Sequence, residues 1–351
     1  MRKLVKLSLV AAVAVSGLTS VNAASLEESI KGVDISGKVR YRMEHLNSTG
    51  QEDQDVNIDV KVVVPVNDKV SFVSNLNIDN DNQENGFTNA GGDTAGNSDK
   101  TFNLDNYYFQ YVDGGATVLL GTQDIPGRLT DAETGSGVVA LYNIGNFTVG
   151  AASMYNTAIT SEMLNSVIAM GTVGPVSLLG QYVDVDDVAD AYNLKADASF
   201  GPAKVGVEYS EVNPDGSSAE LSTAKAYASA KMGIVSGQVT YAQTGDNGSG
   251  QLDASSETPS EYLLWQLGTW QKADMDVIAV DASVAITPKV SLRAAYADGE
   301  IGTTDVSELL GQVSYKMSKN LLTYVRASSY DNGVAATDDS ERVRLEVKYT
   351  F

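Results

Sequence analysis

The chain has 351 residues, of which 43% are hydrophobic, and it carries a net charge of −21, no cysteine and one histidine, His45. Without cysteine it forms no disulfide and no thiolate centre, and one histidine excludes a metal site built from histidine and cysteine. Such an acidic chain attracts cations and is a poor partner for nucleic acid, while its hydrophobic content argues against disorder.

The first 23 residues have the pattern of a secretory signal peptide. Three basic residues precede an apolar run over residues 7–18, and a small-residue exit ends at Ala23. The run is too short to cross a membrane, which takes about 20 apolar residues. We therefore predict that residues 1–23 are removed and that residues 24–351 form a single exported domain. That domain holds 21 basic against 45 acidic residues, a net charge of −24.

From residue 33 onward, apolar and polar residues alternate in segment after segment. Segments 33–44, 56–66 and 70–79 each place valine, isoleucine, leucine or tyrosine on one side and charged or amide residues on the other. Successive side chains of a strand point to opposite faces, so this period indicates β-strands. Helical spacing is nowhere sustained, and we predict an all-β protein.

The connectors between these segments alternate between short and long. The short ones, rich in Gly, Pro and Asn, are 66–69, 113–115, 143–146, 174–175, 201–202, 232–233, 287–289 and 318–320. The long ones are 47–54, 80–100, 124–135, 157–164, 185–190, 213–221, 245–274, 299–305 and 331–340. Together they separate about 18 strands, and loop lengths sorted by side are typical of a transmembrane antiparallel β-barrel.

The last ten residues, RVRLEVKYTF, alternate without a break to the final residue. Alone, this pattern also fits a soluble strand lying on a core. In a barrel, the strand pairs with the first one and closes the sheet, because a bilayer leaves no backbone group without a protein partner. Tyr349 and Phe351 then lie at the depth favoured by aromatic rings. A terminal aromatic residue also resembles the signal read by outer-membrane insertion machinery.

The N-terminal region resembles a known family. LVKLSLVAAVAVSG followed by SLEESIKGVDISGKVRYRME is similar to the start of the campylobacter-type major outer membrane protein family. The likeness lies in Leu26, Glu27, Glu28, Ile30 and Lys31, then Val33, Asp34, Ser36 and Gly37. It implies an 18-stranded trimeric general porin, which is a water-filled, cation-preferring channel with a calcium ion near its constriction.

General porins narrow their lumen with a long loop that folds inward, and the third long connector is the candidate here. Residues 121–137 carry Asp124, Arg128, Asp131 and Glu133. The LTDA stretch resembles a Thr-Asp pair in the family's constriction loop, which makes Asp131 the candidate calcium ligand. The alternative is a surface loop whose acids are solvated.

A basic wall is expected opposite this loop. The first and last strands become neighbours on closure, and two further arginines join them from nearby strands. The predicted wall is Lys38, Arg40, Arg42, Arg293, Arg326, Arg342 and Arg344. Acids facing guanidinium groups across a narrow opening favour polar solutes, and the overall excess of acid favours cations.

The sequence therefore predicts a trimeric porin of the bacterial outer membrane for ions and small hydrophilic solutes. Its partners are its own copies, outer-membrane lipids and the insertion machinery. No catalytic dyad or phosphate-binding loop is visible, so no enzyme is predicted. Two alternatives stay open: a substrate-specific channel of the same architecture, and an exported β-rich adhesin or surface protein. WQLGTW (265–270) is apolar for a loop, and either packs inside the mouth or belongs to a strand.

Overall fold

The computed structural model describes residues 32–47, 50–79, 101–130, 133–157, 159–252, 263–333 and 340–351. The predicted signal peptide, residues 1–23, lies outside this part of the chain. In the described residues, no helix is long and apolar enough to cross a membrane.

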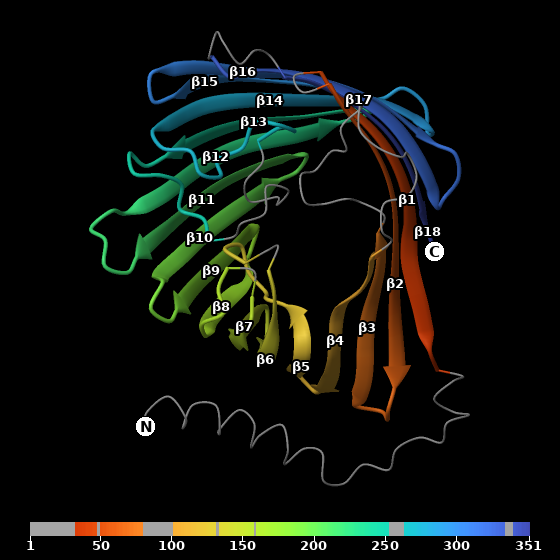
Figure 1. Ribbon diagram of the computed structural model, residues 1–351, viewed down its shortest axis with the longest axis vertical. Coiled ribbons are helices and arrows are strands. Elements are labelled where there is room, and N and C mark those ends of the chain that lie inside the picture. The colour runs from red at the N-terminus through yellow and green to blue at the C-terminus, as the bar shows by residue number, and fades with distance from the viewer. Residues whose placement is uncertain are drawn as a thin grey trace.

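Eighteen antiparallel strands follow one another through the described residues and form one closed sheet (Figure 1). Each strand pairs with its neighbours in sequence, and β1 also pairs with β18, so the predicted all-β barrel of about 18 strands is confirmed. The strands are β1 (Asp34–Leu46), β2 (Gln51–Pro65), β3 (Val70–Asp79), β4 (Thr101–Asp113), β5 (Ala116–Asp124), β6 (Thr134–Ile144), β7 (Phe147–Tyr155), β8 (Leu164–Val173), β9 (Val176–Val185), β10 (Ala189–Phe200), β11 (Ala203–Pro214), β12 (Leu221–Met232), β13 (Val235–Thr244), β14 (Met275–Ala285), β15 (Val290–Ile301), β16 (Thr304–Lys316), β17 (Leu321–Asp331) and β18 (Ser340–Thr350).

The C-terminal residue closes the barrel. The backbone N–H of Gly37 donates to the carbonyl of Phe351, and the N–H of Phe351 donates to the carbonyl of Gly37, both at 3.0 Å. The ladder then continues from the Lys38–Thr350 pair to the Leu46–Arg342 pair. A side chain at Gly37 would lie 2.2 Å from the carbonyl oxygen of Asp59, so the seam requires glycine there. The chain thus leaves no free sheet edge at its junction.

The apolar face of the sheet points outward. On β18 Val343 is 43% exposed, and Phe351 directly after it is 44% exposed, whereas Arg344 and Glu346 are each only 5% exposed. A soluble barrel would show the reverse, because its apolar side chains would fill the centre. Hydrocarbon is therefore the environment that this outward face requires.

Aromatic residues mark both edges of the outward apolar band. Tyr192 and Phe200 stand eight residues apart on β10, roughly 21 Å along the barrel axis at a tilt of about 40°. At the long-loop end, tyrosine hydroxyls donate to carboxylates: Tyr182 to Asp190, Tyr209 to Glu211, Tyr241 to Asp276 and Tyr296 to Asp298. Rings that face lipid while their hydroxyls reach polar groups are typical of a membrane interface.

Three connectors predicted to be long are short, and those predictions were wrong. Only residues 47–50 separate β1 from β2, residues 186–188 separate β9 from β10, and residues 302–303 separate β15 from β16. Ladder hydrogen bonds continue beyond the apolar band here, since polar residues pair across strands as well as apolar ones do. Sequence polarity therefore marked the edge of the membrane band rather than the end of the strand.

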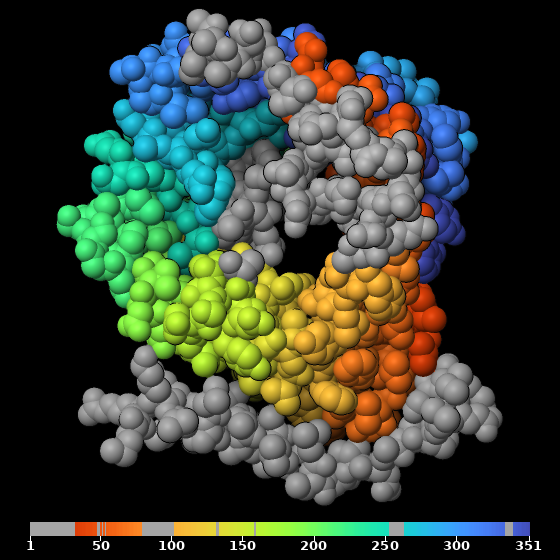
Figure 2. Space-filling model, viewed as in Figure 1, coloured from red at the N-terminus to blue at the C-terminus, as the bar shows by residue number. Residues whose placement is uncertain are grey.

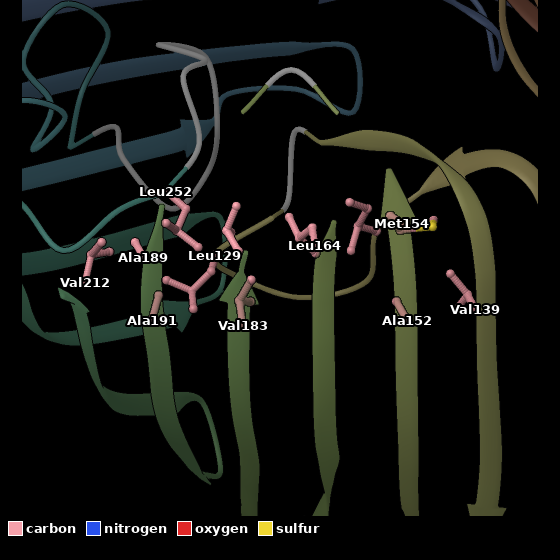
Figure 3. Packing of buried hydrophobic residues seen from close by; sticks show 12 residues of the cluster. Leu129, Val139, Ala152, Met154, Leu164, Val183, Ala189, Ala191, Val212 and Leu252 are labelled. Carbon is pink, nitrogen blue, oxygen red and sulfur yellow. The ribbon is translucent and has the colours of Figure 1, made fainter. Parts of the chain in front are cut away.

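Two clusters of buried apolar residues lie inside the barrel, where inward-folded segments cover the wall. The first joins Ile125 and Leu129 to inward-facing residues of β6–β11 such as Val183 and Ala191 (Figure 3). The second joins Leu264, Trp265 and Leu267 to inward-facing residues of β14–β16. Away from these two patches, the inner surface is largely polar, and this polar surface is the candidate functional site.

Candidate functional site: the barrel lumen

The segment after β5 is bonded to the inner face of the barrel through Gln181 on β9. The backbone N–H groups of Arg128 and Leu129 donate to Gln181 Oε1 at 2.7 and 2.9 Å, and Gln181 Nε2 donates to Thr130 Oγ1 at 3.0 Å. A side chain at Gly127, which has φ of 147°, would lie about 2 Å from the Gln181 amide. We name residues 125–130 the first inward segment.

The guanidinium group of Arg128 ties this segment to β11. Its Nε and Nη2 reach the two carboxylate oxygens of Glu208 at 2.9 and 3.1 Å, a two-point ion pair. Asn193 also donates to Glu208, at 3.0 Å. Both side chains of the ion pair are largely buried, so solvent weakens the pair less than it would at the surface.

The other predicted constriction residues have different surroundings. Asp124 is exposed to the lumen and accepts a hydrogen bond from Asn106 at 3.0 Å. Glu133 is 2% exposed and therefore points away from lumen water. Asp131 lies outside the described residues. Within the described part of the chain, no three acidic or histidine side chains are grouped to hold a metal ion, so those residues do not offer a calcium site by themselves.

A second segment, residues 263–270, also folds against the inner wall. We name it the second inward segment. The carboxylate of Glu308 on β16 accepts backbone N–H groups from Trp265 at 3.2 Å, Gln266 at 2.9 Å and Leu267 at 2.8 Å. Gln266 adds bonds to Ser328 Oγ at 2.8 Å and to the carbonyl of Ser340 at 3.0 Å. Of the two interpretations of WQLGTW, packing inside the mouth is therefore confirmed.

Trp265 stacks on three arginines of the wall. Its ring centroid lies 5.0, 4.7 and 5.0 Å from the guanidinium carbons of Arg326, Arg342 and Arg344. Guanidinium groups over an indole are attracted by the negative face of the ring, most strongly when water is excluded. The second inward segment thus fixes the orientation of these arginines.

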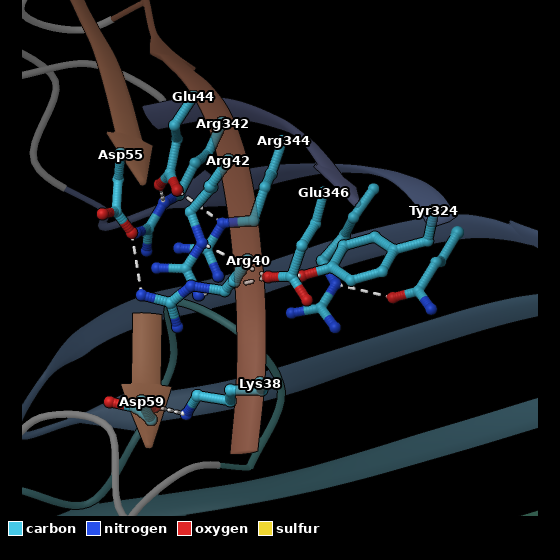
Figure 4. A network of polar contacts seen from close by, with 12 residues as sticks. Lys38, Arg40, Arg42, Glu44, Asp55, Asp59, Tyr324, Arg342, Arg344 and Glu346 are labelled. Carbon is cyan, nitrogen blue, oxygen red and sulfur yellow. Dashed lines mark hydrogen bonds and ion pairs between the residues drawn. The ribbon is translucent and has the colours of Figure 1, made fainter. Parts of the chain in front are cut away.

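Five carboxylates on adjacent strands pair with most of the seven cations of the predicted basic wall (Figure 4). Six of its seven cations have carboxylate partners. The pairs are Lys38–Asp59 at 2.6 Å, Arg40–Asp55 at 2.7 Å, Arg42–Glu346 at 3.3 Å, Arg293–Asp281 at 2.6 Å, and Glu44 with both Arg342 and Arg344. Arg326 instead donates from Nε to Gln312 Oε1 at 2.7 Å.

A second wall, which sequence reasoning missed, consists of amides and acids on β2–β5. Asp59, Asp105 and Asp124 line a recess of about 720 Å³ together with Asn75, Asn77 and Asn106. The register of β3 with β4 shifts at Asp105, between the Asn75–Asn106 and Leu76–Leu104 pairs. The signal was present in the sequence as repeated Asn-x-Asp and Asn-x-Asn triplets, which a period of two places on one face. We name this set the amide–acid wall.

An opening passes through the ring of strands. Figure 2 shows it in the middle of the face that the reader sees, above the yellow and orange strands. The geometry combines a polar, charge-bearing inner surface with a central passage and an apolar outer surface. Such an arrangement conducts water and small solutes, and it needs no reacting group.

Comparisons with known proteins agree with this architecture. The family described as Campylobacter major outer membrane protein matches residues 2–214. Among solved structures, OpdK of Pseudomonas aeruginosa is similar, with a TM-score of 0.75 and 12% identity over 92% of this chain and 99% of that one. OccK3 (OpdO) of the same organism has a TM-score of 0.75 and 13% identity, over 93% of this chain and 97% of that one. OccK5 (OpdH) has a TM-score of 0.71 and 12% identity, over 92% of this chain and 98% of that one. No curated protein sequence matches this chain.

Proposed function

Because the chain belongs to the Campylobacter major outer membrane protein family, we propose that it is a trimeric porin that prefers cations and passes ions and small hydrophilic solutes by diffusion. It is an outer-membrane β-barrel channel and not an enzyme. The exported soluble adhesin is excluded, because the apolar residues of the closed sheet face outward.

The amide–acid wall is the observation that carries the cation preference. Four carboxylates in the wall itself pair with the five arginines of β1, β15 and β18, so most of the positive charge of these arginines is offset locally. Within the amide–acid wall Lys38 pairs with Asp59, and the wall also presents Asp105, Asp124 and several amides beside one further lysine, Lys61. Rings or walls of acidic side chains raise the local concentration of cations.

The first inward segment supports the constriction role proposed for residues 121–137. Its bonds to Gln181 and Glu208 hold backbone over the inner faces of β9 and β11, where it occupies lumen cross-section. Asp124 is the loop acid that lumen water reaches in the described residues. We propose that ions pass between Asp124 and the arginines around Trp265.

Planar-bilayer recording tests the channel and its preference together. Protein from the outer membrane is added to one side, and the reversal potential is measured across a tenfold KCl gradient. We expect stepwise conductance with a reversal potential of the sign that K⁺ selectivity gives. A folded protein that shows no conductance, or one that is anion-selective, would contradict the proposal.

Three further parts of the proposal concern assembly. We propose cleavage after Ala23, a homotrimer, and recognition of Tyr349 and Phe351 by the insertion machinery; the two rings stack with centroids 6.1 Å apart. Mass spectrometry of the mature protein tests the cleavage site. A gel run with and without heating tests the trimer, which would migrate as one slow band until heated. Removing Phe351 should lower the amount of assembled barrel, whereas removing an outer-loop residue should not.

A substrate-specific channel of the same architecture is the second candidate. Arg326 favours it, since this arginine lacks a carboxylate partner in the described residues. Saturable transport of one solute class would distinguish it from a general porin.

A further inference from the structure

Arginines dominate one row of side chains across β15–β18. Cross-strand register places Arg293 opposite Gln312, Gln312 opposite Arg326, and Arg326 opposite Arg344. Like charges directly opposite each other destabilise a sheet unless they are compensated. Arg293 is compensated by Asp281, and Arg344 by Glu44. Arg326 stands between them, and in the described part of the chain no carboxylate lies within ion-pair distance of it.

The surroundings of Arg326 leave only one edge of its guanidinium group available. Its carbon lies 5.0 Å from the ring centroid of Trp265 and 5.1 Å from that of Tyr324. Its Nε is already bonded to Gln312 at 2.7 Å. The side chain is half-buried, and its Nη atoms are not among the fully buried polar atoms that lack a hydrogen-bond partner, so lumen water reaches these donors. Two parallel N–H donors in a fixed plane match the two oxygens of a carboxylate.

We propose that Arg326 is a binding site for the carboxylate group of small organic acids that pass through the lumen, an inference that rests on the proposed channel function. Asp281 pairs with Arg293, and Arg344 shares Glu44 with Arg342, so Arg326 is the cation of the row that has no carboxylate partner in the described residues. A monocarboxylate would supply that partner through the planar pair of Nη donors. Phosphate is the competing anion in the test below.

The lumen next to the row has space for the rest of such a solute. A recess of about 460 Å³ lies at its β15 end, lined by Arg293, Gln238 and Thr240 among others. Two strand spacings separate Arg293 from Arg326, roughly 10 Å. Gln238 and Thr240 lie on β13, two strands beyond Arg293, so the recess offers lumen space near the body of a hydroxylated solute whose carboxylate is held by Arg326.

Single-channel recording with gluconate as the probe tests this site. Gluconate is a hydroxylated monocarboxylate, sorbitol is a neutral polyol of similar size, and inorganic phosphate is the competing anion. We expect gluconate to interrupt the K⁺ current of the wild-type channel with a frequency that saturates, and sorbitol not to do so. Arg326→Gln should weaken this binding by about tenfold or more, since a charge-assisted two-point bond is lost. The gluconate affinity of Arg326→Lys should lie between those of wild type and Arg326→Gln.

Lys348→Gln is the matched control. Lys348 faces the same lumen from β18, close to the short-turn end, and its replacement removes the same charge away from the two rings. Its gluconate binding should stay within about twofold of wild type. The proposal is overturned if the conducting wild-type channel shows no saturable block, if phosphate binds more tightly than gluconate, or if Lys348→Gln loses as much as Arg326→Gln. Failure of the channel proposal looks different, because then no current flows at all.

Discussion

The two inward segments solve the same problem with different chemistry. Each crosses the lumen side of the barrel with backbone N–H groups that need acceptors, and each finds them on one wall side chain. Residues 125–130 use the neutral amide of Gln181, and residues 263–270 use the carboxylate of Glu308. Hydrogen bonds to a charged acceptor contribute about 1.5–3 kcal/mol, against about 0.5–1.5 kcal/mol for neutral ones. We infer that the second segment is held more firmly than the first, which makes the first the more easily displaced part of the constriction.

Of four substitutions, Glu308→Ala should have the largest effect on how firmly an inward segment is held. It removes the acceptor of three backbone N–H groups in a site where the carboxylate is fully buried. We expect the second inward segment to lose roughly 2–4 kcal/mol of local stability and to leave the wall. Trp265 would then release the arginines beneath it. Single-channel conductance should rise, with wider fluctuations of the open current. An unchanged conductance would show that this segment does not narrow the pore.

Gln181→Ala should have the next largest effect. Two backbone N–H groups lose their acceptor and Thr130 loses a donor, a cost of about 1–3 kcal/mol for the first inward segment. Trypsin cuts after arginine, so release of the segment should expose the Arg128–Leu129 bond to cleavage in membrane-embedded protein. Wild-type protein should resist under the same conditions. Equal cleavage of the two proteins would mean that Gln181 does not hold the segment.

Glu308→Gln sharpens the comparison by giving the second segment the neutral kind of acceptor that the first has. Glutamine keeps the shape of the side chain and removes its charge. We therefore expect the second inward segment to lose about 1–2 kcal/mol of local stability, less than in Glu308→Ala. The rise in conductance should therefore lie between wild type and Glu308→Ala. If Glu308→Gln behaves like Glu308→Ala, charge rather than the number of acceptors decides how the segment is held.

Glu208→Gln should have the smallest effect of the four changes. It weakens the two-point ion pair with Arg128 but leaves the backbone bonds to Gln181 in place. We expect a cost of about 1 kcal/mol, because the amide oxygen of glutamine still accepts from Arg128 and a charge-assisted bond becomes a neutral one. The freed guanidinium group should lower the K⁺ preference measured by reversal potential without changing trypsin resistance. A loss of resistance comparable to that of Gln181→Ala would contradict this ranking.

The sequence carried the architecture more clearly than the site. Alternation on strands such as β1 and β18 has a period of two that a bilayer enforces, so the barrel, its closure at Phe351 and the strand number were all predictable. The first inward segment was placed by its order among the connectors. The partners of this segment could not be predicted. Gln181 and Glu208 lie some 50 and 80 residues away in the sequence, and only the strand register brings them near.

The second inward segment shows the limit of pattern reasoning most clearly. WQLGTW departs from strand periodicity, and nothing local states that Glu308, about 40 residues further on, will accept its N–H groups. Alternation suggested which arginines share one face of the sheet, yet their ion pairs depend on cross-strand partners such as Asp55 and Glu44. Pairing of this kind follows from register, which short alternating segments do not fix by themselves.

The central claim is that the apolar face of the sheet meets lipid and the polar face meets water. Because the chain has no cysteine, single-cysteine variants give a clean test. Val239 and Thr240 are neighbours on β13, with Val239 on the outward face and Thr240 lining the recess beside Arg293. In liposomes, a membrane-impermeant thiol reagent should modify Thr240→Cys and reduce its current, while Val239→Cys stays unmodified. Modification of Val239→Cys with protection of Thr240→Cys would mean that the sheet is turned the other way, and the account would fail.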